Sequence, residues 1–277
     1  MKNVVKINFF PLFFVIFFSC NKFHIPIQKA PLDTILNRYV DDGFYPFLYA
    51  RIEDRSGNVI YEHSSVNQSL IPVKKIDGQT LIRIWSMSKL VTISLVMNLV
   101  EEGLLSLDDP VNKYIPEFID LKVATDENCV SLTQVDSMSK ICPFTLSPVK
   151  IKMTIRHLIN HEAGFYYATT QSECLNQGLA DNNIPRAMDS NELISKFAKL
   201  PLIQQPGESS FYGTNTTILG LVAERATGKN LKELIIERLT NPLNINGLKY
   251  NTAFNETLLP QITGVDTILR VAKDGEL

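Results

Sequence analysis

The stretch "SMSKLVTISLVMNLVEEGLL", residues 86–105, places a serine and a lysine three positions apart at the start of a long apolar run. Hydrophobic residues fall on nearly every face of the helix that this stretch predicts, so we expect the helix to be buried in a larger body. Gly103 follows the run and is typical of a residue just past a helix end. The stretch therefore predicts a buried helix that ends at Gly103.

The spacing of Ser86 and Lys89 suggests nucleophilic chemistry, although a serine and a lysine at this spacing also occur together by chance. Residues three apart on a helix share a face, so the two side chains should lie within reach of each other. A serine hydroxyl becomes a good nucleophile when a base accepts its proton, and lysine can be that base only when it is neutral. Burial against Trp85, Leu90 and Val91 is expected to lower the pKa of Lys89 and so favour its neutral form.

Hydrophobic periodicity and turn residues predict the elements on either side of this helix. Before it, we expect a helix that ends at Gly43 and a hairpin over 46–64 with its turn at 54–58. After it, mainly helices and loops are expected. These are a capped segment over 106–118, a helix from Thr154 to near Gly164, a helix over 189–202 and two helices over 216–245 divided at Gly228.

Several motifs of other enzyme classes are absent from the sequence. No G-x-S-x-G elbow is present, and "ATGKN" (226–230) lacks the upstream glycine of a phosphate-binding loop. His157 and His161 stand four apart on a predicted helix, which is a metal-ligand spacing, but no third ligand is evident. We therefore expect no metal and no organic cofactor.

The first twenty residues, "MKNVVKINFFPLFFVIFFSC", read as a secretory signal of the lipoprotein type, with Cys20 as the lipid anchor. A plain signal peptide with a chance cysteine is the alternative reading. Residues 21–35 are expected to form a tether, which would place the protein in a bacterial cell envelope, attached to the membrane through the lipid. Export would permit disulfides: either Cys129 pairs with Cys142 and leaves Cys174 over, or all three are unpaired thiols.

The overall composition is that of an ordinary globular protein. Hydrophobic residues make up 45% of the chain and charged residues 20%, with a formal charge of −2 and no basic block. A nucleic-acid partner therefore has no electrostatic support.

Three blocks of the chain resemble the serine β-lactamase-like superfamily, which includes class C β-lactamases, low-molecular-weight penicillin-binding proteins and family VIII esterases. The blocks are "IRIWSMSKLVTISLVMNLVEEGLLSLDDPVNKYIPEF" (82–118), "MTIRHLINHEAGFYY" (153–167) and "QQPGESSFYGTNTTILGLVAERATGKNLKELIIERLTNPLNI" (204–245). The resemblance implies that Ser86 is the acylated nucleophile, that Lys89 takes its proton and that Tyr212 shares the proton transfer. It also implies an α/β (α+β) fold of the β-lactamase/transpeptidase type, in which helices flank an antiparallel sheet beside a mostly helical subdomain.

Two departures from the family pattern bear on function. Thr214 stands where β-lactamases and carboxypeptidases usually have asparagine, which favours ester substrates, and no K-T-G or H-x-G motif follows Tyr212. We therefore expect residues 36–277 to form a C-terminally truncated domain that lacks the last sheet strands. The leading hypothesis is a serine hydrolase that forms an acyl-enzyme with a β-lactam, D-Ala peptide (peptidoglycan-type) or small-molecule ester substrate. The alternative is a non-catalytic, degenerate envelope lipoprotein of the same fold.

Overall fold

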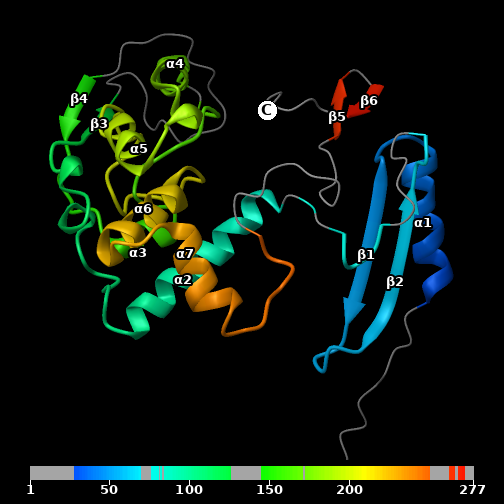
Figure 1. Cartoon of the computed structure of the whole chain (residues 1–277). Coiled ribbons are helices and arrows are strands. Elements are labelled where there is room, and N and C mark those ends of the chain that lie inside the picture. The colour runs from blue at the N-terminus through cyan, green and yellow to red at the C-terminus, as the bar shows by residue number, and fades with distance from the viewer. Residues whose placement is uncertain are drawn as a thin grey trace, which may run out of the picture. The chain divides into compact units, whose positions relative to one another are not determined.

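The computed structural model of the chain describes residues 28–69, 76–80, 82, 84–125, 145–170 and 172–249, together with strands at 262–265 and 268–271. These residues fall into two compact units, which are described separately: one from the two ends of the chain (1–80 and 260–277), the other from residues 81–259 (Figure 1). The predicted signal segment, with Cys20, lies outside the described residues.

The first unit contains helix α1 (Lys29–Asp41) and the antiparallel hairpin of β1 (Phe47–Glu53) and β2 (Val59–Val66). Helix α1 packs along the hairpin (Figure 1), where the Tyr61 hydroxyl of β2 donates to the Asp33 carboxylate at 2.8 Å. The hairpin predicted over 46–64 is confirmed. Helix α1, however, begins inside the segment 21–35 that was expected to be a tether. Strands β5 (Ile262–Val265) and β6 (Ile268–Val271) form a second antiparallel pair.

The second unit is mostly helical, as expected. Its elements, in chain order, are η1 (Trp85–Met87), α2 (Ser88–Glu101), η2 (Val111–Lys113), η3 (Pro116–Phe118), β3 (Lys122–Thr125), β4 (Thr145–Pro148), α3 (Ile155–Ile159), α4 (Glu173–Asn182), η4 (Ile184–Arg186), α5 (Ser190–Phe197), α6 (Asn215–Thr227), α7 (Leu231–Ile235) and the π-helical turn η5 (Ile236–Thr240). The antiparallel pair β3–β4 and helix α4 are not in the sequence prediction.

The core of this unit forms where α2, α3, α5 and α6 pack together. One face of α2 is buried, through residues such as Leu95 and Leu99, whereas Leu90 and Met97 are exposed. The helix is thus buried in a larger body as predicted, but on one face only, although apolar residues occupy nearly all of its faces. Aromatic contacts join α5 to the loop after α3, since the rings of Phe165 and Phe197 meet edge to face at 5.9 Å.

Two of the family-like blocks are joined by their backbones. The Ile155 N–H donates to the Asp109 carbonyl and the Arg156 N–H to the Leu107 carbonyl, at 3.2 and 2.8 Å. The Arg156 guanidinium also donates to both carboxylate oxygens of Asp108. The acidic residues of "SLDDPV" thus hold the start of α3 against the segment that follows α2.

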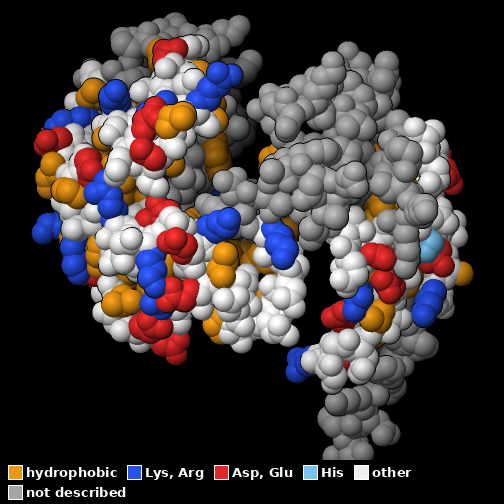
Figure 2. Space-filling view, viewed as in Figure 1, with side chains coloured by type: hydrophobic (Ala, Val, Ile, Leu, Met, Phe, Trp, Pro, Cys, Tyr) orange, Lys and Arg blue, Asp and Glu red, His pale blue; other side chains and the backbone are white. Residues whose placement is uncertain are grey.

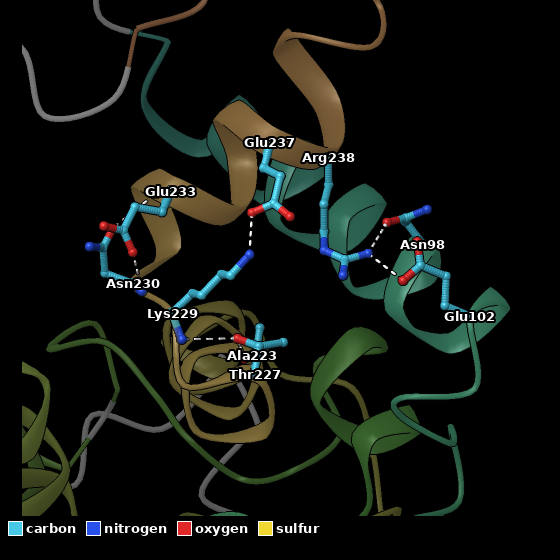
Figure 3. Close-up of polar contacts among 9 residues, drawn as sticks. All are labelled: Asn98, Glu102, Ala223, Thr227, Lys229, Asn230, Glu233, Glu237 and Arg238. Atoms are coloured by element: carbon cyan, nitrogen blue, oxygen red, sulfur yellow. Dashed lines mark hydrogen bonds and ion pairs between the residues drawn. The ribbon is translucent and has the colours of Figure 1, made fainter.

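Polar contacts fasten the last helices to α2 (Figure 3). The Arg238 guanidinium of η5 donates to the Asn98 side chain at 3.1 Å and to the Glu102 carboxylate at 2.5 Å. Asn230 and Glu233 form a capping box at the start of α7, after Gly228 ends α6 in a left-handed conformation. These contacts hold α7 and η5 against α2.

The surface of this unit is mixed in charge, since acidic and basic side chains alternate on the face shown in Figure 2. Among the described residues, no helix combines the length and hydrophobicity that a bilayer crossing needs.

Candidate active site

Ser86, Lys89 and Tyr212 meet at the start of α2, although 126 positions separate Ser86 from Tyr212. The Lys89 ammonium donates to the Ser86 hydroxyl oxygen at 3.1 Å, and the Tyr212 hydroxyl donates to the same oxygen at 2.5 Å. Ser86 belongs to η1, Lys89 to the first turn of α2 and Tyr212 to the loop before α6. The structure thus brings together the three residues that the sequence singled out.

The backbone just before Ser86 is strained. Trp85 has a φ of 46°, which lies in the left-handed region that bulky residues avoid. Such outliers cost about 1–3 kcal/mol and persist only where surrounding structure enforces them. The unusual turn at Trp85 sets the direction in which the chain enters η1, and with it the position of the Ser86 side chain.

The ammonium of Lys89 lies above the face of the Tyr212 ring, 4.7 Å from its centroid, and 5.6 Å from that of Tyr167. Burial is the largest influence on the pKa of Lys89 and lowers it, but hydrogen bonds with Tyr212 and Tyr167 outweigh burial, and the pKa is raised. The expectation of a lowered pKa is therefore wrong. Trp85 and Leu90, which were to bury the amine, are 60% and 68% exposed.

Tyr212 shows the opposite shift. Its hydrogen bond with Lys89, followed by that with Ser86, lowers the pKa of the phenol. The phenolate form of Tyr212 is therefore easier to reach than in an isolated tyrosine, whereas the neutral form of Lys89 is harder to reach, so Tyr212 is the better placed of the two to accept a proton from Ser86.

His161 holds the backbone on both sides of Tyr212 and was missed as a site residue by the sequence. Its carbonyl accepts from the Phe211 N–H at 2.8 Å, its Nδ1 accepts from the Gly213 N–H at 3.3 Å, and its ring stacks on Tyr212 at 5.1 Å. Because Nδ1 accepts, the neutral ring carries its proton on Nε2. Burial, and then the charge of Lys89, lower the pKa of His161 and keep the ring neutral.

Gly213 lets the Tyr212 loop run against the chain after α3. A Cβ atom at this position would lie 2.2 Å from the Phe165 carbonyl oxygen and 2.6 Å from the Cα of Tyr166, which no side chain can tolerate. The two residues that follow turn inward as well. Thr214 is buried and its hydroxyl donates to the Tyr166 carbonyl, while the buried Asn215 amide donates to the Phe165 carbonyl at 3.1 Å.

The two histidines do not form the metal-ligand pair that a helical spacing would give. Helix α3 ends at Ile159 rather than near Gly164, and His161 has a left-handed φ of 59°. His157 instead caps α3, because its Nδ1 accepts from the Thr154 N–H at 3.2 Å. Among the residues that the structure describes, no three His, Cys, Asp or Glu side chains are grouped as metal ligands.

The cysteine prediction also needs correction. Cys174, in α4, is disulfide-bonded, so it is neither a left-over thiol nor one of three unpaired thiols. Cys129 and Cys142 lie outside the described residues.

A serine, lysine and tyrosine that share hydrogen bonds, on a mixed α/β fold with antiparallel strands, define the serine β-lactamase/transpeptidase-like class. The chain belongs to the Beta-lactamase family, whose model matches residues 55–264. This match confirms the family and the fold class expected from the sequence.

Known relatives within this class include hydrolases and acyltransferases. Acyltransferase mokF of Monascus pilosus is 26% identical over 90% of this chain, and lovastatin esterase of Penicillium rubens is 26% identical over 85% of it. Among solved structures, EstCE1, described as a hydrolase with promiscuous acyltransferase activity, is 22% identical, covers 89% of this chain and has a TM-score of 0.64. The chain spans 58%, 56% and 59% of the lengths of these three proteins.

Proposed function

We propose that this protein is a serine hydrolase that cleaves carboxylic esters through an acyl-enzyme on Ser86. The observation that carries the proposal is the double contact to one oxygen: Lys89 and Tyr212 both hydrogen-bond the Ser86 hydroxyl. Relatives described as an esterase and an acyltransferase support the same reaction class.

In the proposed first step, the Tyr212 phenolate accepts the Ser86 proton while the serine oxygen bonds to the acyl carbon. The carbonyl electrons move to oxygen, and the backbone N–H of Ser86 is one donor to that oxyanion. As the tetrahedral intermediate collapses, the bond to the leaving alcohol breaks and Tyr212 returns the proton to it. Lys89 stays protonated and stabilises the phenolate.

In the second step, Tyr212 takes a proton from water, and the resulting hydroxide attacks the acyl carbon. The bond to Ser86 breaks, and the serine oxygen recovers its proton from Tyr212. An alcohol in place of this water would give acyl transfer.

Esters suit the site better than amides. Thr214 has no amide, and its hydroxyl is turned into the protein. The Asn215 amide is buried and donates to the Phe165 carbonyl, so no side-chain amide from these two residues faces a substrate beside Tyr212. An amide substrate would have to place its N–H without such a partner, whereas an ester has no N–H to satisfy.

A fluorophosphonate probe tests the proposal, because it labels an activated serine. Mass spectrometry of the labelled chain should place the adduct on Ser86, and 4-nitrophenyl hexanoate should be hydrolysed. Ser86→Ala should remove both signals. A folded chain that shows neither labelling nor turnover would instead support the non-catalytic alternative.

We also propose that the protein is lipid-anchored in a cell envelope through Cys20. The support is the sequence of residues 1–20, with its early lysines, short apolar run and Ser19 before the cysteine.

A further inference from the structure

Four exposed apolar side chains gather on α1 and on the turn that follows it: Ile35, Tyr39, Phe44 and Tyr45. Phe44 is the most exposed of them, at 64%. The Tyr39 ring meets the Phe44 ring at 5.8 Å and the Tyr45 ring at 6.1 Å, edge to face in both pairs. These four residues, here called the aromatic patch, belong entirely to the first unit. Exposed apolar patches of this kind mark contact sites more often than scattered apolar residues do.

The geometry of α1 explains why the patch faces away from the hairpin. The side chains of Asp33 and Asn37 hydrogen-bond to side chains of β2, so these two residues mark the inner face of the helix. Each residue of an α-helix is turned by about 100° from the one before it. Ile35 and Tyr39 each stand two positions beyond an inner residue, so they lie on the opposite face. No packing against the hairpin accounts for their apolar character.

The backbone holds the aromatic rings together. The Tyr39 carbonyl accepts from the N–H groups of both Phe44 and Tyr45, at 3.0 and 3.2 Å. Gly43, with a φ of 79°, turns the chain back onto the end of the helix so that both bonds can form. The rings are therefore presented by a hydrogen-bonded turn, and little conformational freedom is left to lose when they bind a surface.

The chemistry of the patch suits a boundary between apolar and polar surroundings. Neither the Tyr39 nor the Tyr45 hydroxyl has a hydrogen-bond partner among the residues that the structure describes. Tyrosine combines an apolar ring with a polar tip, and it is enriched where membranes meet water. A purely apolar partner would leave both hydroxyls unsatisfied, whereas lipid headgroups and interfacial water can bond them.

The proposed lipid on Cys20 would keep this patch near a bilayer. Lys29, the first residue of α1, stands nine positions after Cys20. Nine extended residues span about 30 Å at most, and a helix of 13 residues adds about 20 Å. The patch would therefore stay within about 50 Å of the lipid, and such a tether raises the local concentration of membrane surface.

We propose that the aromatic patch docks onto the surface of a lipid bilayer, with its rings at the level of the headgroups. This inference rests on the proposed lipid anchor, which supplies the bilayer. The charges beside the patch are those of Arg38, Asp41 and Asp42, so it carries no excess of positive charge. Docking is therefore driven by the aromatic and aliphatic side chains and does not require anionic lipid.

Vesicle binding without the lipid tests the patch separately from the anchor. The processed chain (residues 20–277) with Cys20→Ser would be sedimented with phosphatidylcholine vesicles at increasing lipid concentration. Phe44→Ser should weaken binding roughly five- to tenfold, the loss expected for an aromatic ring that is partly buried in the interface. Phe44→Trp should strengthen it, because tryptophan favours the interface. Neither change should alter the melting temperature, since this side chain is exposed.

Val59→Ser is the matched control. Val59 is an exposed apolar residue of the same unit, at the end of the hairpin where β1 is followed by its turn. Its replacement should leave vesicle binding unchanged. Adding phosphatidylglycerol to the vesicles should raise the affinity no more than about twofold, because the patch has no excess positive charge.

Several results would overturn the proposal: no vesicle binding, binding that appears only with phosphatidylglycerol, or equal losses in Phe44→Ser and Val59→Ser. A dimer in analytical ultracentrifugation that Phe44→Ser dissociates, without vesicle binding, would assign the patch to a second copy of the chain. Failure of the anchor gives a different result, because vesicle binding by the patch would then persist in a chain whose Cys20 is never lipidated.

Discussion

The ammonium of Lys89 lies 4.7 Å from the ring centroid of Tyr212, and both side chains donate to the same oxygen of Ser86. The lysine therefore acts on the tyrosine as well as on the serine. Its positive charge and hydrogen bond stabilise the phenolate, which makes Tyr212 the stronger candidate for the general base.

This arrangement predicts a specific pH dependence. Tyr212 must be deprotonated to act as a base, so kcat/KM should be low at acid pH and rise through a pKa below that of an ordinary tyrosine. Lys89→Met removes the main cause of the lowered pKa, so the phenol should then titrate at higher pH. Tyrosinate absorbance against pH, with Tyr212→Phe as the subtraction control, measures the shift. A titration unaffected by Lys89→Met would contradict this assignment.

His161 should act as a positioning residue for Tyr212. His161→Leu removes the acceptor for the Gly213 N–H and puts a bulky residue at a left-handed φ, so we expect kcat to fall at least about tenfold with a smaller change in KM. His161→Asn keeps an acceptor and tolerates this backbone conformation, and it should recover part of the loss.

A matched substitution separates positioning from stability. His157→Asn disturbs the cap of α3, so it should lower the melting temperature with little change in kcat. Equal losses of kcat in His157→Asn and His161→Leu would show that His161 acts through general stability alone.

Gly213→Ala should displace the Tyr212 loop, because the new methyl group would overlap the Phe165 carbonyl. We expect a lower melting temperature together with slower fluorophosphonate labelling of Ser86. Gly247→Ala is the control, since nothing lies within 4 Å of a Cβ atom there. Normal labelling of Gly213→Ala would mean that the loop can relax without moving the phenol.

Phe197→Ala should destabilise the helical unit by about 3–5 kcal/mol, the usual cost of deleting a fully buried aromatic ring. Phe197 is 1% exposed and packs against Phe165, so removing its ring would leave a closed apolar cavity that solvent does not fill. Denaturant unfolding monitored by circular dichroism gives the free energy of unfolding. Met188→Ala, at an 88% exposed position, should change it by no more than about 0.5 kcal/mol.

The lipid anchor can be tested in cells. Metabolic labelling with a fatty-acid analogue should modify the full-length protein, and Cys20→Ser should abolish the label and move the protein out of the membrane fraction. A label that survives Cys20→Ser would exclude this anchor.

Local signals in the sequence were enough to predict much of the helical unit. Helices α2 and α6 of this unit end at the predicted Gly103 and Gly228, as α1 of the other unit does at Gly43, and all three glycines have the positive φ that is inexpensive only for glycine. Ser86 and Lys89 could be paired from helical geometry alone. Tyr212 could be added only through the family resemblance, because 126 positions separate it from Ser86 in the chain.

Features that depend on tertiary contacts were not predictable in this way. Strands β3 and β4 are four residues each and pair across positions 126–144, too far apart for a hairpin signal. The role of His161 arises from one left-handed residue that ends α3 early and turns the ring onto Tyr212. The pKa of Lys89 depends on two tyrosines from distant segments, whose effect outweighs the burial that the local sequence suggested.

The left-handed backbone at Trp85 has a consequence for how this protein could be improved or could evolve. Selection for heat resistance alone should favour glycine or asparagine at position 85, since either relaxes the turn that a tryptophan must be forced to make. The same replacement would leave the Ser86 side chain less well positioned. A substitution at position 85 that raises thermal stability should therefore lower the catalytic rate.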